Sequence, residues 1–189
     1  MAKSNKSRFA ILGMLGLFPS SSGYDIKKLM EGSTQHFWKE TFSSIYPILQ
    51  ELERDGLIDQ TGSPPSSGRM RTTYSLSGEG KKSLQEWLAK PAEPEPFRHE
   101  LLLKLFFGEF VQPSLNRKHL EEYQKALMAK LEIFHIIKGR LLCEEKESAS
   151  LPYWLLTLDY GFKQAESALQ WTKEALKQIR KLEKESSHA

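Results

Sequence analysis

The chain has 189 residues, of which 39% are hydrophobic and 27% charged, and its formal net charge is +3, which allows one sizeable domain or two small ones. A single cysteine, Cys143, excludes an intrachain disulfide framework and a cysteine-based zinc site, and no apolar run reaches the roughly 20 residues of a transmembrane helix. So small a charge also excludes a histone-like polycation, and any binding of nucleic acid requires a local basic patch.

The first segment is an apolar run over residues 9–18 that follows three basic residues. Secretory signal peptides begin in the same way. However, residues 19–23 contain no A-x-A cleavage site, and Ile11, Leu12 and Leu15 recur at helical spacing. We therefore expect a buried first helix over about residues 8–18 of a cytoplasmic protein.

Two further helices are predicted before the pattern changes. The second covers about residues 24–31 and the third about residues 42–55, because glycines follow both stretches at positions where helices commonly end. Residues 20–23 are expected to form a loop that can cap the next helix. Pro47 is tolerated only in a first helical turn, which favours a start of the third helix at Ser43 or Ser44.

Beyond Gly56 the pattern becomes extended. Residues 57–61 and 72–76 contain the β-branched and aromatic side chains typical of short strands, with a turn-rich loop between them. A fourth helix is expected over about residues 78–90. Three helices followed by a two-stranded hairpin are typical of a winged helix-turn-helix domain, in which the third helix enters the major groove of DNA.

The outer face of the third helix carries uncharged groups that can hydrogen-bond to phosphates or base edges. The helix N-terminus also favours a phosphate, and nearby basic side chains supply positive charge. The candidate DNA-binding residues are Lys39, Thr41, Ser43, Ser44, Tyr46, Gln50, Arg69 and Arg71. Taken singly, each also fits a cap, a packing residue or a solvated loop residue, whereas the ordered set favours DNA binding. A winged-helix adaptor that binds protein through this surface is the alternative.

Residues 91–96 contain three prolines and predict an extended linker between a DNA-binding domain over residues 1–90 and a helical domain over residues 97–189. Residues 1–90 carry 12 Lys and Arg against 9 Asp and Glu, whereas residues 91–189 carry 15 of each. The positive charge therefore belongs to the first part.

Three helices are predicted in the second part, over about residues 98–110, 115–147 and 153–183. Helices this long are not expected to cover their apolar seams on each other and on a small first domain alone, so the seams predict a homodimer on pseudo-palindromic DNA. A helical hairpin within a monomer is the alternative. The predicted dimerisation residues are Leu120, Leu127, Phe134, Leu141, Leu158, Phe162, Leu169, Leu176 and Ile179. The expected fold class is mainly α with a small β-hairpin wing.

Catalytic and cofactor motifs are missing from the sequence, which has no G-x-S-x-G elbow, no P-loop and no G-x-G-x-x-G. His119 and Glu122 have a spacing that suits a metal, but a surface helix produces such a pair by chance. We therefore predict no catalytic residue, no cofactor and no metal site, and do not expect an enzyme.

The sequence resembles the PadR family of bacterial transcriptional regulators over nearly its whole length. The matching pieces are FAILG at 9–13, SGYDI at 22–26, IYPIL at 45–49 with Leu52, Glu53, Asp55, Gly56 and Leu57, TYSLS at 73–77 with Gly80 and Leu84, and ELLLK at 100–104. The pair Phe37–Trp38 fits the phenolic-acid-responsive branch. The resemblance implies a dimeric winged-helix repressor that releases DNA when a small, often aromatic, effector binds, and it places Tyr46 near DNA. Residues 64–67, PPSS, depart from the family's more charged wing.

Bulky aromatic side chains suggest where such an effector would bind, because planar ligands stack well on aromatic rings. We predict an aromatic-lined pocket between the two domains, with Trp38 and Trp154 as the leading candidates. Each ring also fits ordinary core or interface packing. The full candidate set is Phe37, Trp38, Tyr153, Trp154, Tyr160 and Trp171.

Overall fold

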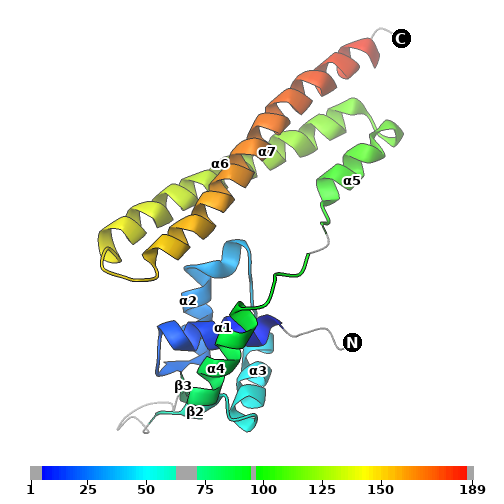
Figure 1. Ribbon diagram of the computed structural model, residues 1–189. Coiled ribbons are helices and arrows are strands. Elements are labelled where there is room, and N and C mark those ends of the chain that lie inside the picture. The colour runs from blue at the N-terminus through cyan, green and yellow to red at the C-terminus, as the bar shows by residue number, and fades with distance from the viewer. Residues whose placement is uncertain (1–5, 63–71, 95–96, 187–189) are drawn as a thin grey trace, which may run out of the picture. The chain divides into compact units, whose positions relative to one another are not determined.

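The computed structural model describes residues 6–62, 72–94 and 97–186 (Figure 1). It divides into two compact units, Met1–Pro94 and Glu95–Ala189. The structure is mainly helical with one small antiparallel sheet, as the sequence predicts. Among the described residues, every helix falls short of the length and apolarity that a bilayer crossing requires.

The first unit contains the predicted helices and hairpin, together with one strand that was not predicted. Its elements are α1 (Lys6–Leu17), β1 (Ser21–Ser22), α2 (Gly23–Glu31), a short 3-10 helix η1 (Thr34–His36), α3 (Phe42–Arg54), β2 (Ile58–Gln60), β3 (Thr73–Leu76) and α4 (Gly78–Leu88). The observed strands β2 and β3 lie inside the two stretches predicted to be strands.

The sheet has the strand order β1-β3-β2, with both pairings antiparallel. Ser21 pairs with Tyr74, and Ile58 pairs with Leu76. The prediction of a loop at residues 20–23 is therefore wrong at Ser21 and Ser22, which form a strand, whereas the prediction that this stretch caps the next helix is confirmed by Ser22. Two serines have little strand propensity of their own, and they become a strand because β3, more than 50 residues further on, supplies the partner.

One apolar core holds the first unit together. The buried side chains come from the inner faces of α1, α2 and α3 and from the sheet, and Trp38 and Leu84 pack against them in part. Phe9 of α1 stacks on Trp87 of α4, with ring centroids 4.8 Å apart. The fully buried members are Ile11, Leu12, Leu15, Ile26, Met30, Ile45, Leu49, Leu52 and Ile58.

The second unit consists of α5 (Glu100–Phe106), the 3-10 helix η2 (Gly108–Phe110), α6 (Pro113–Glu144) and α7 (Leu151–Ser186). The single helix predicted over residues 98–110 is therefore interrupted after Phe106. Pro113 begins α6, where a proline fits because the first helical N–H groups need no partner. The helices α6 and α7 lie side by side and run in opposite directions (Figure 1).

The seams of α6 and α7 cover each other along much of their length. Leu120, Leu127 and Phe134 of α6 and Leu176 of α7 are buried within one chain, whereas the other predicted dimerisation residues, Leu141, Leu158, Phe162, Leu169 and Ile179, are half-buried. Within one chain, α6 and α7 therefore cover part of their seams on each other. The role of these residues in a dimer stays a prediction.

Two features let α6 and α7 approach closely. A Cβ at Gly161 would lie 2.9 Å from the ring of Phe134, so only glycine leaves room for that ring. Thr172, which interrupts the apolar seam of α7, is fully buried, and its hydroxyl donates to the carbonyl of Ala168 at 2.7 Å. A polar side chain is tolerated there because its hydrogen bond is made within its own helix.

We expect Gly161→Ala to lower the free energy of unfolding by about 1–3 kcal/mol, because the new methyl group overpacks the Phe134 site. The matched control is Gly139→Ala in α6, where a Cβ would meet nothing within 4 Å. This control should stabilise the protein by up to about 1 kcal/mol through helix propensity. Urea denaturation measures both, and equal effects of the two substitutions would contradict this packing.

Candidate nucleic-acid interface

The helix α3 begins at Phe42, with Thr41 as its N-cap. The hydroxyl of Thr41 accepts from the backbone N–H of Ser44 at 3.3 Å, and the hydroxyl of Ser44 accepts from the N–H of Thr41 at 3.0 Å. This reciprocal pair is a capping box, which satisfies two N–H groups that the helix itself leaves unpaired.

The predicted start at Ser43 or Ser44 is wrong, because Pro47 lies in the second turn of α3. Proline has no N–H to donate to the carbonyl of Ser43, four residues earlier. Both Ser43 and Pro47 are exposed, so water can reach that carbonyl. The capping box therefore sets the start of the helix, and the proline is accommodated on its solvent side.

The exposed residues Ser43, Tyr46 and Gln50 form the α3 outer face, because a spacing of three or four residues places them on the same side of the helix. Tyr46 is 49% exposed. The opposite side carries Ile45 and Leu49 into the core. The structure thus brings together three of the sequence-predicted DNA-binding residues on one accessible surface.

The other predicted DNA-binding residues have different positions. Thr41 is exposed, and its hydroxyl lies 2.8 Å from that of Ser43. Ser44 is half-buried, and its hydroxyl donates to the carboxylate of Glu40 at 2.7 Å. Lys39 is exposed just before the cap. Arg69 and Arg71 lie outside the described residues.

Two aromatic residues beside the α3 outer face were missed from the sequence. Tyr24 stacks on Phe42 with ring centroids 6.0 Å apart, and Phe42 stacks on Tyr46 at 6.4 Å. We call these three rings the aromatic stack. Tyr24 and Phe42 lie outside the apolar stripes of their helices and near the helix N-termini. In the sequence, this position was the signal that could have indicated two exposed aromatic rings.

The close approach of α2 to α3 requires a glycine. A Cβ at Gly23 would lie 2.9 Å from Cε1 of Tyr46 and 3.2 Å from a methyl group of Leu49. Gly23 thereby positions the tyrosine ring on which the aromatic stack ends.

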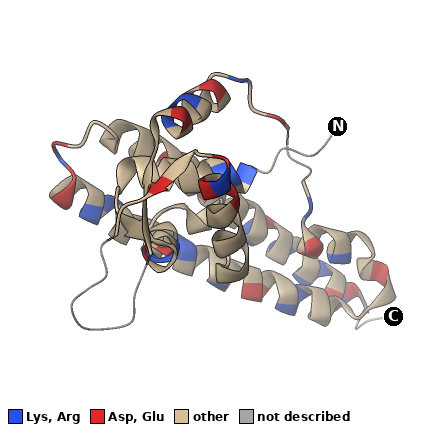
Figure 2. Ribbon diagram, turned by 90° about the horizontal axis from the view of Figure 1, so that it is seen from below, with Lys and Arg blue, Asp and Glu red and all other residues tan. Residues whose placement is uncertain are grey.

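Charge near this surface is largely paired within the unit. Lys27 and Lys28 both donate to Glu31, at 2.8 and 3.0 Å, and these bonds lower the pKa of the Glu31 carboxyl. Arg8 donates to Asp55, at the end of α3, and holds the pKa of that carboxyl below its usual value. Lys and Arg alternate with Asp and Glu along the described ribbons (Figure 2).

The predicted effector residues belong to both units. In the first unit Phe37 is exposed, and Trp38 is half-buried against the core. Tyr153, Trp154, Tyr160 and Trp171 lie along α7 in the second unit, where the amide of Gln164 donates to the hydroxyl of Tyr160 at 2.8 Å. The pocket that these residues were predicted to share stays a prediction. Within the described ranges, no group of three or more His, Cys, Asp or Glu side chains is placed to hold a metal ion.

Comparison with known families matches both parts of the chain. Residues 11–86 match the model of the transcriptional regulator PadR-like family, and residues 97–180 match the model named virulence activator alpha C-term. The first unit therefore carries a domain of the PadR-like family. The resemblance inferred from the sequence is thereby confirmed, and the family is one of transcriptional regulators, not enzymes.

Individual PadR-like relatives support the same assignment. The negative transcriptional regulator PadR of Bacillus subtilis is 33% identical over 101 residues, which span 53% of this chain and about half, 55%, of that protein. A crystal structure of B. subtilis PadR in complex with operator DNA superposes with a TM-score of 0.80 at 25% identity, covering 92% of this chain and 98% of the other. A structure of the same regulator with p-coumaric acid has a TM-score of 0.72 at 25% identity, with the same coverage of 92% and 98%.

We expect Thr41→Ala to lower the free energy of unfolding by about 1 kcal/mol, because it removes the N-cap of α3. The control is Ser43→Ala, two residues further along the chain. It removes an exposed hydroxyl that caps nothing, and it should change the free energy of unfolding by less than about 0.5 kcal/mol. Thermal unfolding followed by circular dichroism distinguishes the two, and equal losses would show that Thr41 is not the cap.

Proposed function

We propose that the chain is a DNA-binding transcriptional repressor that binds a pseudo-palindromic operator as a homodimer and releases it when a small aromatic effector binds. The observation that carries the proposal is the α3 outer face, on which Ser43, Tyr46 and Gln50 are exposed beside a capped helix N-terminus. The PadR fold with operator DNA, which this chain resembles along 92% of its length, supports it.

The chemistry of this face suits DNA. A glutamine amide can bond to an adenine edge with both its donor and its acceptor, and hydroxyl groups of serine and tyrosine bond to phosphates or bases. The N-terminal turn of α3 favours a phosphate through the partial positive charge of its N–H groups. Lys39, which is exposed two residues before the cap, adds a full charge. The glutamine amide, the hydroxyl groups and the N-terminal turn contribute orientation and selectivity, and the lysine contributes affinity.

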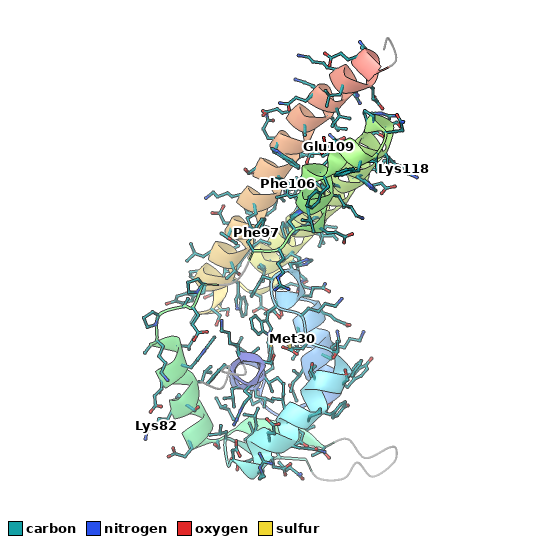
Figure 3. All side chains as sticks on the ribbon, turned by 90° about the vertical axis from the view of Figure 1, so that its right-hand side faces the viewer. Met30, Lys82, Phe97, Phe106, Glu109 and Lys118 are labelled. Atoms are coloured by element: carbon teal, nitrogen blue, oxygen red, sulfur yellow. The ribbon has the colours of Figure 1, made fainter. Side chains whose placement is uncertain are left out.

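A second copy of the chain would cover apolar surface that the second unit exposes. Leu103, Phe106, Phe107 and Phe110 form the α5–η2 apolar face, and Phe106 is 81% exposed. Phe106 and Glu109 mark this stretch in Figure 3. Contiguous exposed aromatic side chains are typical of protein interfaces. We place the dimer contact on this face together with the half-buried seam residues of α6 and α7.

Repression and release follow from linkage. A dimer presents two α3 outer faces at one spacing, and an effector that prefers another spacing lowers DNA affinity by no more than its differential affinity for the two states. The PadR of B. subtilis is a negative regulator, and its structure has been solved with p-coumaric acid. The six aromatic side chains predicted to contact an effector remain the candidates for this chain.

Titration against the DNA upstream of its own gene tests the proposal, with two salt concentrations and unrelated DNA as competitor. Saturable, salt-sensitive binding that resists the competitor supports a sequence-specific regulator. Addition of p-coumaric acid to the preformed complex should then release the DNA. Binding that any competitor removes equally would contradict operator recognition, and a pull-down would then test the protein-binding adaptor.

We expect Tyr46→Ala and Gln50→Ala each to weaken operator binding by about 1–3 kcal/mol if the side chain contacts a base. Gln85→Ala is the matched control, since Gln85 is an exposed glutamine on α4 of the same unit. It should leave operator affinity unchanged. Fluorescence anisotropy with operator and random DNA measures all three, and a loss that is the same for both DNAs would rule out a role in base recognition.

We expect Phe106→Glu to convert the dimer into a monomer, because a carboxylate in an apolar interface must be desolvated. Leu88→Glu is the control, at a leucine that is 65% exposed in the first unit. Sedimentation velocity reports the oligomeric state of each variant. A Phe106→Glu protein that stays dimeric would move the interface away from the α5–η2 apolar face.

A further inference from the structure

A buried carboxylate lies directly before the DNA-facing helix. Glu40 is only 7% exposed. One of its oxygens accepts from the indole N–H of Trp38 at 2.9 Å, and the other accepts from the hydroxyl of Ser44 at 2.7 Å. A buried carboxylate is stable only when its oxygens have such donors. Loss of one of these two hydrogen bonds therefore also weakens the other.

Ser44 connects this carboxylate to the cap of α3. Its oxygen accepts from the N–H of Thr41 at 3.0 Å in the capping box. A hydroxyl has one hydrogen, which can go to Glu40 or, at 2.9 Å, to the carbonyl of Thr41. Donation to the charged carboxylate is the stronger bond, and it leaves the lone pairs of Ser44 for the Thr41 N–H.

Trp38 belongs to a different part of the unit from the α3 outer face. Its side chain packs against the apolar core just after η1. The three residues Trp38, Glu40 and Ser44, which we call the Trp38–Glu40–Ser44 chain, therefore join a core-packed ring to the first turn of α3. That turn holds Thr41 and Ser43, and it leads to Tyr46 in the next turn.

We propose that Glu40 is a positioning residue for the α3 outer face and that Trp38 controls it. When the indole N–H is in place, both carboxylate oxygens are satisfied and the first turn of α3 is held in the geometry that meets DNA. When the indole moves, Glu40 loses a donor and is drawn toward a new partner, which loosens the bond to Ser44. A state with only one of the two hydrogen bonds is therefore disfavoured, because a half-satisfied buried carboxylate is costly in free energy.

This inference rests on the proposed function and adds a route of regulation to it. Any contact that displaces the Trp38 ring would lower operator affinity without touching DNA or the α3 outer face. The intact and the broken network that we propose are the two states that coupling between separate sites requires.

A double-mutant cycle tests the coupling. Trp38→Phe keeps an aromatic ring and removes the N–H, whereas Ser44→Ala removes only the hydroxyl. Operator affinity, random-DNA affinity and thermal stability are measured for the wild type, both single variants and the double variant. The control cycle combines Ser44→Ala with Trp87→Phe, because Trp87 is a tryptophan of the same unit that stacks on Phe9 instead.

We expect each single variant to weaken operator binding several-fold while random-DNA binding stays unchanged. The double variant should bind the operator nearly as well as the single variant with the lower operator affinity. This corresponds to a coupling of roughly two- to tenfold. The control cycle with Trp87→Phe should be additive. With Glu40 changed to alanine, or to glutamine where the alanine variant unfolds, the coupling between Trp38 and Ser44 should fall to less than about twofold.

The contrary outcomes separate the two proposals. Additive effects of Trp38→Phe and Ser44→Ala in a wild type that binds its operator overturn the positioning role alone. The positioning role is also overturned if Trp87→Phe lowers operator affinity as much as Trp38→Phe does at an equal loss of thermal stability. A wild type without competitor-resistant binding overturns the proposed function and the positioning role with it.

Discussion

The helical period of α3 determines which of its side chains the first unit presents to solvent. Successive residues of an α-helix are rotated by about 100° around its axis, so residues three or four apart share a side and the apolar ones gather on one face. The capping box between Thr41 and Ser44 fixes the start at Phe42. From there Ile45 and Leu49 are directed inward, and Tyr46 and Gln50 outward. The capping box thereby holds the first turn of the proposed recognition surface, beside Ser43.

The same two hydroxyls have different further partners, and this divides their roles. Thr41 turns its hydroxyl toward Ser43 on the exposed side. Ser44 turns its hydroxyl toward the buried Glu40. Thr41 thus connects the cap to the surface, and Ser44 connects it to the interior. For this reason we expect changes near Trp38 to reach the proposed recognition surface.

The second unit solves a different problem. Helices of 32 and 36 residues carry long apolar seams, and the antiparallel hairpin buries part of these seams within one chain. Gly161 and the internally bonded Thr172 make this close packing possible. Apolar side chains stay exposed on the α5–η2 apolar face and along both long helices, among them Ile136 of α6 and Leu156 of α7. These are the surfaces of the second unit that are available to a second subunit.

The order and type of the helices follow from the sequence because helical spacing, caps and terminating glycines are local signals. The outer position of Ser43, Tyr46 and Gln50 is also a local property, since it needs only the helical period and an apolar opposite side. These signals were enough to predict the fold class and the α3 part of the candidate site.

Tertiary structure decided the features whose partners are distant in the chain. Ser21 and Ser22 are a strand only because Tyr74 and Thr73 lie beside them. Pro47 is accommodated in the second turn because the cap and the core hold the helix around it. Whether Leu120 and Phe134 meet α7 or a second subunit depends on how the chain turns back at residues 145–150. Period and propensity describe one segment at a time, whereas strand pairing, ring stacking and seam partners depend on which segments meet.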